Sequence, residues 1–137
     1  MAWANGNEPH LTLSRNRLLD LQRPDGGWGQ IPGLESDAYA TGLALYALHE
    51  GGQIPSKHPD YQKGIDFLLN TQLEDGSWYV KGRTRKFQPY FESGFPHGHD
   101  QWISAHATGW AVIALMFDTP VVQQVQSAYK PGSEPSP

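Results

Sequence analysis

Apolar residues fall at helical spacing in several segments of the chain, and stretches rich in glycine and proline separate these segments. The spacing predicts helices over 11–21, 37–49 and 59–70, and a fourth helix that begins at 100 or 104 and ends near 117. Prolines and glycines make 22–35 a predicted loop. The predicted order is therefore helix, glycine-rich loop, helix, and then the same again.

Residues at the predicted helix ends support these boundaries. Ser36 is expected to cap the second helix, and Glu35 and Asp37 beside it suit the positive end of the helix dipole. Pro59 fits the first turn of the third helix. A short terminal helix is predicted over 121–129.

Two sets of residues recur along the chain at fixed offsets. Six residues recur 50 positions later; they are Leu18, Leu19, Gln22, Asp25, Gly26 and Trp28, which match Leu68, Leu69, Gln72, Asp75, Gly76 and Trp78. Seven residues of the second predicted helix recur 67 positions later in the fourth; they are Ala38, Ala40, Thr41, Gly42, Ala44, Ala47 and Leu48. The larger second offset indicates an insertion of about 17 residues within 79–102, because repeats carry such insertions in loops.

The length of 137 residues supports one domain with a modest core. We expect an N-terminal arm over 1–10, two helical hairpin repeats over 11–117, and a partly disordered C-terminal tail over 118–137. The longest apolar run covers only 110–117, far short of the ~20 residues that cross a bilayer, so we expect a soluble protein without a membrane span. The first residues show no secretory signal pattern, and the compartment stays undetermined.

Charge and cysteine content exclude several classes of function. The net charge of −4 argues against nucleic acid as a partner of the whole protein. The chain has no cysteine, which excludes disulfides, thiolate catalysis and thiolate-bound zinc.

The segment from Lys63 to Gln72, followed by Asp75-Gly-Ser-Trp78, resembles the QW motif of squalene-hopene cyclases, a repeat also found in protein prenyltransferases. The copy that ends in Gln22 and Trp28 is similar in its second half. The resemblance implies an all-α fold of the α/α-toroid type, of which this chain would supply about two hairpins. It also implies structural roles for Gln22, Trp28, Gln72 and Trp78, which in that family tie neighbouring hairpins together.

The chain departs from this family at the residues that carry chemistry. Squalene-hopene-type cyclases use an Asp-x-Asp-Asp acid, and no two aspartates are adjacent here. Protein prenyltransferases hold zinc through Asp, Cys and His, and cysteine is absent. Neither chemistry carries over to this sequence.

The sharpest candidate for chemistry lies near the end of the insertion, in His97-Gly-His99-Asp100. In an extended segment, residues two apart face the same side, so both imidazoles could meet one divalent metal, with Asp100 or Glu92 as an oxygen ligand. His97, His99, Asp100 and Glu92 are also the candidate catalytic residues. In that case a histidine acts as general acid or base and a carboxylate orients it. The alternative is structural: Asp100 caps the fourth helix, and the histidines bond the loop. His106 is expected to be a packed core histidine.

The insertion also combines lysines and arginines with aromatic residues. Its candidate ligand-binding residues are Arg83, Arg85, Tyr90, Phe91 and Trp102. Arginine forks match carboxylate and phosphate groups, so an anionic or saccharide ligand fits this composition. A solvated loop whose aromatics pack on the helices is the alternative.

Three functions remain open from the sequence. The preferred one is a repeat module that is not catalytic by itself, packs with further helical repeats of the same or a longer chain, and uses the loop as a ligand or partner surface. The others are a fragment of a toroid enzyme acting on an isoprenoid, and one acting on an anionic polysaccharide. Two hairpins leave uncovered faces, so self-association into a homo-oligomer is a further expectation.

Overall fold

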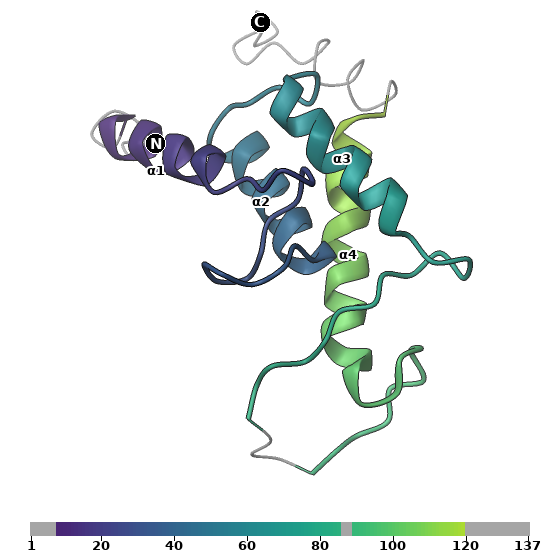
Figure 1. Cartoon of the computed structure of the whole chain (residues 1–137). Helices are drawn as coiled ribbons and strands as arrows, with labels where there is room; N and C mark the ends of the chain where they lie inside the picture. Colours follow the sequence, from purple (N-terminus) through teal and green to yellow (C-terminus); the bar gives the residue numbers. More distant parts are fainter. Residues whose placement is uncertain (1–7, 86–88, 120–137) are drawn as a thin grey trace, which may run out of the picture.

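The computed structural model describes residues 8–85 and 89–119. Its elements, in chain order, are α1 (Glu8–Asp20), α2 (Ala38–Glu50), α3 (Pro59–Thr71), the short 3₁₀ helix η1 (Gly98–Asp100) and α4 (Gln101–Phe117) (Figure 1). Within those ranges the chain is all-helical and contains no strand, as the sequence predicted. The helix predicted at 121–129 lies outside the described residues. No helix in the described part is long and apolar enough to span a membrane.

The helix boundaries follow local chemistry. α1 begins at Glu8, earlier than the predicted start at 11, and Pro9 stands in its first turn, where the missing N–H costs no helical hydrogen bond. α3 begins at Pro59 for the same reason. The prediction that Ser36 caps α2 is wrong, because Asp37 is the cap and its carboxylate accepts from the Ala40 N–H at 2.8 Å.

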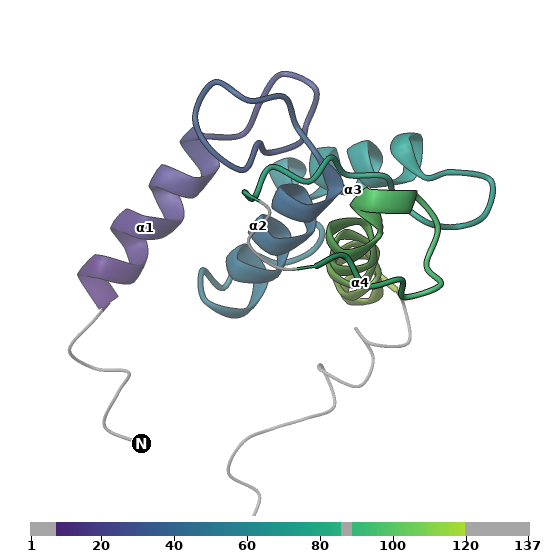
Figure 2. The same cartoon turned by 90° about the horizontal axis from the view of Figure 1, so that it is seen from below.

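The closest helix contact joins α2 and α4, which pack along each other (Figures 1 and 2). A Cβ built on Gly42 would lie 2.6 Å from the backbone carbon of Trp110 and 2.8 Å from the nitrogen of Ala111. Only glycine fits there without separating the two helices. On the α4 side, Ala107 and Ala111 are fully buried. Small residues on both helices therefore determine this contact.

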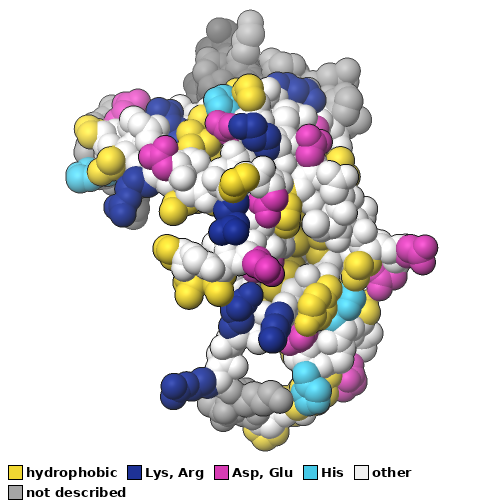
Figure 3. Space-filling model, viewed as in Figure 1, with side chains coloured by type: hydrophobic (Ala, Val, Ile, Leu, Met, Phe, Trp, Pro, Cys, Tyr) yellow, Lys and Arg dark blue, Asp and Glu magenta, His cyan; other side chains and the backbone are white. Residues whose placement is uncertain are grey.

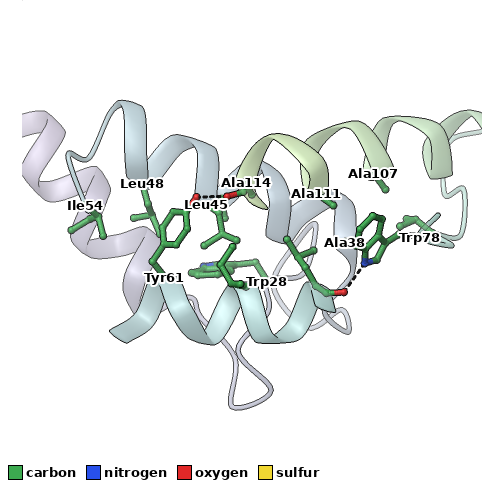
Figure 4. Close-up of a cluster of buried hydrophobic side chains, with 14 residues drawn as sticks. Trp28, Ala38, Leu45, Leu48, Ile54, Tyr61, Trp78, Ala107, Ala111 and Ala114 are labelled. Atoms are coloured by element: carbon green, nitrogen blue, oxygen red, sulfur yellow. Dashed lines mark hydrogen bonds between the residues drawn. The ribbon is translucent and has the colours of Figure 1, made fainter. Parts of the chain in front are cut away.

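α3 lies across α2 and α4 and closes the core with larger side chains (Figure 4). Tyr61 and Leu68 of α3 are fully buried, as are Leu45 and Leu48 of α2. The Tyr61 hydroxyl donates to the carbonyl of Ala114 at 3.0 Å and so links α3 to α4. Burial raises the pKa of Tyr61 well above its ordinary value, so the side chain stays neutral.

α1 differs from the other three α-helices in that none of its residues is buried. It stands at one side of the molecule, beside α2 (Figure 2). Leu11 is 48% exposed and Leu13 is 59% exposed. The core therefore sits between α2, α3 and α4. Leu18 and Leu19 at the end of α1 pack partly against it, whereas Leu11 and Leu13 remain largely uncovered.

Candidate functional site

The insertion leaves the helical core at Trp78 and returns to it at Asp100. Its first residues run along α4: the Trp78 N–H donates to the Thr108 hydroxyl, and the Val80 N–H donates to the Ser104 hydroxyl at 3.0 Å. Ser104 is fully buried by this contact. The site geometry is thus fixed at one edge by hydroxyl groups of α4.

Asp100 holds the two ends of the insertion together. Its carboxylate accepts from the Gly82 N–H at 2.9 Å and from the Tyr79 hydroxyl at 2.8 Å. These two hydrogen bonds, from Gly82 above all, hold the pKa of Asp100 below its ordinary value. Asp100 stands at the N-cap position of α4 but makes no capping hydrogen bond with its side chain. The structural alternative is therefore wrong in its detail: the carboxylate binds the loop instead of the helix end.

His97 contacts Ser77 and the rings of Tyr79 and Phe95. Ser77 Oγ lies 2.6 Å from Asp75 Oδ1 and 2.8 Å from His97 Nε2. Because the single hydroxyl proton of Ser77 is given to Asp75, His97 Nε2 is the donor in the second contact. This is the reverse of the arrangement in which a histidine activates a serine nucleophile. The same bonds lower the pKa of Asp75, mainly through the Ser77 hydroxyl.

Gln101 is the centre of the polar network under the loop, and sequence reasoning missed it. Its side chain is fully buried and bonds Tyr90, Glu92, Ser93 and the carbonyl of Gly98. The Tyr90 hydroxyl and the Gly94 N–H both donate to Glu92, and with Gln101 they lower the pKa of that carboxyl. A lone glutamine at a helix start carries no sequence signal for such a role, because its partners come from the insertion.

The structure does not bring His97, His99 and Asp100 together as the extended-segment argument assumed. His97 has a positive φ of 87°, and 98–100 form a turn of 3₁₀ helix, so the segment is not extended and the spacing of two residues does not place both imidazoles on one side. His99 packs on the ring of Tyr90, with centroids 4.3 Å apart. Among residues 8–85 and 89–119, no three His, Asp or Glu side chains are grouped so that they could hold a metal ion.

The candidate ligand-binding residues lie at the surface, four of them on the loop and Trp102 in the first turn of α4. Arg83 and Arg85 are exposed, and no described carboxylate forms an ion pair with either. Phe91 is 65% exposed and Trp102 is 50% exposed. The Trp102 indole N–H donates to the Phe91 carbonyl, which keeps these two aromatic residues side by side. Tyr90 is partly exposed, but its hydroxyl belongs to the internal network.

Comparison with known proteins identifies the repeats. The chain is 33% identical over 96 residues to the lanosterol synthase of Saccharomyces cerevisiae, an alignment that covers 70% of this chain and 12% of the relative. It is 32% identical over 107 residues to the squalene–hopene cyclase of Bradyrhizobium diazoefficiens, covering 70% of this chain and 15% of the relative. The chain carries terpene cyclase-like repeats. The aligned part thus spans about an eighth to a seventh of the length of these relatives.

Further comparisons add a shorter match and two negative results. The chain is 36% identical over 61 residues to a drimenyl diphosphate synthase of Streptantibioticus cattleyicolor, covering 44% of this chain and 11% of the relative. No known protein-family profile matches the chain. No solved structure matches it at a significant level.

The tryptophans of the two terpene cyclase-like repeats make equivalent contacts. The Trp28 indole donates to the Leu18 carbonyl and the Trp78 indole donates to the Leu68 carbonyl, both at 2.8 Å. Leu18 and Leu68 stand near the ends of α1 and α3, where helical carbonyls lack an internal partner. In both repeats the indole thus satisfies a carbonyl near the end of the preceding helix.

The glutamines of the two repeats differ in their surroundings. Gln22 donates to the carbonyl of Gly26 in its own turn and to the carbonyl of Asp60 at the start of α3, each at 2.8 Å. It thereby joins the first repeat to the second. Gln72 is exposed and donates to the carbonyl of Gly76 in its own turn at 3.0 Å.

The Asp75–Ser77 contact also has a counterpart in the first terpene cyclase-like repeat. Gly27 stands at the position of Ser77, and the missing hydroxyl is supplied by Ser36, whose Oγ donates to Asp25 at 2.8 Å. A carboxylate–hydroxyl pair thus stabilises the turn in both repeats, through different residues. This equivalence supports a structural role for Ser77.

We expect the anchoring of the insertion by Asp100 to weaken in acid. The folded-state pKa of Asp100 lies below its ordinary value of 3.8, so its contribution to stability is fully present above that pH. The contribution is lost as the pH falls through the lower folded pKa. The amide proton shift of Gly82, followed by NMR from pH 7 to about 2, should titrate with a midpoint below 3.8. In Asp100→Asn this titration should disappear, and a midpoint above 3.8 in the unmodified chain would contradict the assignment.

Proposed function

We propose that this chain is a repeat module that is not catalytic by itself and that uses the 79–102 loop to bind an anionic ligand or partner. The observation that carries the proposal is that the acidic side chains of the loop have internal hydrogen-bond partners and, among the described residues, two of its arginines have none. The acids, Glu92 and Asp100, are bound by internal donors, whereas Arg83 and Arg85 are exposed and unpaired within the described chain.

The form of the loop supports this function. Arg83 and Arg85 lie on an irregular segment outside the helices. Lys and Arg side chains are spread over the face seen in Figure 3, including its lower part, where the insertion lies (Figure 1). Neither Glu92 nor Asp100 forms an ion pair with these arginines. A carboxylate or sulfate group can therefore reach the guanidinium groups without displacing an internal partner.

The candidate catalytic residues support the absence of chemistry in this chain. His97 donates to Ser77, His99 packs on Tyr90, and Glu92 accepts from three groups of the loop. A general base needs a free lone pair within reach of a substrate proton. The Nε2 atom of His97 and both oxygens of Glu92 are instead occupied by groups of the chain, and the His99 ring is packed on Tyr90.

Binding of heparin, an anionic polysaccharide, tests the loop function. In Arg83→Gln/Arg85→Gln the affinity measured by calorimetry at low salt should fall about fivefold to thirtyfold, because two exposed charge contacts contribute roughly 0.5–1 kcal/mol each. Arg17→Gln/Lys63→Gln removes the same charge from α1 and α3 and should bind like the unmodified chain. Equal losses in both double variants would show that only net charge matters, and an unmodified chain that does not bind would refute the ligand class.

A second candidate function rests on the names of the relatives. Lanosterol synthase and squalene–hopene cyclase are cyclases, so the chain could be a segment of an enzyme acting on squalene or a related isoprenoid. The described residues then supply structure, and further repeats supply the reacting groups. The purified chain incubated with squalene should give no cyclised product by gas chromatography. A product that disappears in His97→Ala would overturn the non-catalytic proposal.

We also infer that the module packs against further helical repeats. Stacked helical hairpins bury their apolar faces against their neighbours, and α1 has none of its residues buried. The uncovered leucines of α1 therefore fit a chain in which another repeat lies beside the first.

A further inference from the structure

The internal repeat allows each contact between the two repeats to be compared with its equivalent at the far end of the chain. Gly42 of α2 presses against the backbone of α4. At its equivalent, Gly109 of α4, a built Cβ would have no atom of the described residues within 4 Å, its own helix backbone aside. The same small residue thus stands in the same place on both helices, but only the first has a helix packed on it.

Two further positions show the same difference. A Cβ on Gly26 would lie 2.4 Å from the carbonyl oxygen of Lys63 in α3, whereas one on Gly76 would approach only the side chain of Gln72, at 4.0 Å. Gln22 reaches α3 through the carbonyl of Asp60, whereas Gln72 is exposed. Three positions of the second repeat, Gln72, Gly76 and Gly109, therefore lack the neighbouring helix that their equivalents contact within the described chain.

The opposite end of the chain shows the complementary gap. A hollow of about 690 Å³ lies between α1, the loop at 29–34 and α2. Its walls are mainly apolar, and the α2 side consists of Ala40, Leu43, Ala44 and Ala47. We call it the α1–α2 hollow.

The α2 wall of this hollow matches the surface of α4 on which α2 packs. Ala40, Ala44 and Ala47 are the equivalents, 67 positions earlier, of Ala107, Ala111 and Ala114. Those three alanines of α4 are fully buried, in the helix that packs along α2, whereas in α2 only Ala44 is buried, Ala40 is half-buried and Ala47 is exposed. Leu43, on the same wall, is also exposed. The lining of the hollow therefore suits a helix like α4. Gly109 of that helix would pack on the α2 alanines as Gly42 packs on α4.

We propose that two copies of this chain bind head to tail, with α4 of one copy seated in the α1–α2 hollow of the other. The surface that enters the hollow is the open face of α4, formed by Trp102, Ala105, His106, Gly109 and Ile113. This face is exposed at Trp102 and His106, so the prediction that His106 is a packed core residue is wrong for the single chain. The proposal rests on the proposed packing of the module against further repeats, and names a second copy as the neighbour.

The repeat register also predicts the contacts of the new interface. Position 60, whose carbonyl accepts from Gln22, corresponds to His10 in α1. Gln72 of one copy therefore donates to the His10 carbonyl of the other. Gly109 takes the place of Gly42 and meets the alanine wall of the hollow, continuing the α2–α4 interface across the two copies.

A head-to-tail contact uses different surfaces on the two partners, so it does not close at a dimer. Each pair leaves one hollow and one α4 face free, and further copies can add until a ring closes. The mass of the unmodified chain should therefore rise beyond the dimer with concentration. Sedimentation velocity from micromolar to millimolar concentrations measures this directly.

Two blocking variants test the arrangement. Gly109→Leu fills the open face of α4, and Leu43→Arg places a charge in the hollow; both positions are open enough for the chain to fold, which circular dichroism checks. Each variant alone should be monomeric. An equimolar mixture should form a 1:1 dimer and stop there, because one intact hollow meets one intact α4 face. Asp66→Leu, on the exposed surface of α3, should associate like the unmodified chain.

The outcomes separate this proposal from the loop function. A monomeric unmodified chain at millimolar concentration, association that survives Gly109→Leu, or a mixture that stays monomeric would each overturn head-to-tail binding. Should Gly109→Leu fail to fold, Gly109→Ala replaces it and should weaken association severalfold. Arg83→Gln/Arg85→Gln should associate normally, so loss of heparin binding and loss of self-association are distinguished in the same set of proteins.

Discussion

Replacement of Trp78 with alanine is expected to lower the free energy of unfolding by about 3–5 kcal/mol. The side chain is 1% exposed, in contact with the core, and its indole N–H satisfies the carbonyl of Leu68 at the end of α3. Truncation removes the apolar contacts, leaves a cavity, and leaves the Leu68 carbonyl with only the longer hydrogen bond from the Thr71 hydroxyl, at 3.3 Å. Since small domains are stable by only about 5–15 kcal/mol, the variant should lose much of its stability.

Urea denaturation followed by circular dichroism measures this loss. Phe91→Ala is the matched control, because it removes an aromatic ring that is 65% exposed on the insertion. Its free energy of unfolding should stay within about 0.5 kcal/mol of that of the unmodified chain. A similar loss in both variants would show that Trp78 does not hold the core together.

The second large effect is expected at Gly42, where one added methyl group should destabilise the fold. In Gly42→Ala the new Cβ meets backbone atoms of Trp110 and Ala111 at 2.6–2.8 Å, and backbone cannot move aside as a side chain can. α2 and α4 must separate, with an expected loss of roughly 1–3 kcal/mol. The gain in helix propensity, about 1 kcal/mol, offsets only part of this loss.

Gly109→Ala provides the control from the equivalent position of the other repeat. The position is equivalent to Gly42 but has nothing within 4 Å of the new methyl group. In dilute protein this variant should be as stable as the unmodified chain, or more stable by up to about 1 kcal/mol, because alanine is the better helix former. Thermal unfolding of the two variants at low concentration compares them directly. A loss of equal size in both would show that the close α2–α4 contact at Gly42 does not cause the loss of stability.

The helices and their repeat could be predicted from the sequence because their signals are local. Helical spacing, Pro59 at a first turn and the recurrence of Gln22 and Trp28 at Gln72 and Trp78 all lie within short windows. The small residues that recur in α2 and α4 indicate that these helices can approach closely. Which of the two equivalent glycines is covered depends on what lies beside each helix, and no local pattern records that.

The polar centre of the insertion could not be predicted for a different reason. The metal hypothesis assumed an extended segment at 97–99, but His97 is left-handed and the following residues form a 3₁₀ turn. The buried role of Gln101 arises only once Tyr90, Glu92 and Ser93 have folded back over the start of α4. Local composition indicates that such residues are polar, but their partners are fixed by how the loop closes.

The anchoring of the insertion at both ends has a consequence for protein engineering. Trp78 and Val80 are tied to hydroxyls of α4, and Asp100 binds Gly82, so the distance between the two ends is fixed independently of the residues between them. Because the entropic cost of closing a flexible loop grows only with the logarithm of its length, doubling such a loop costs about 0.6 kcal/mol. The stretch around Arg83 and Arg85 can therefore accept a grafted peptide of comparable length while the helical core keeps its fold.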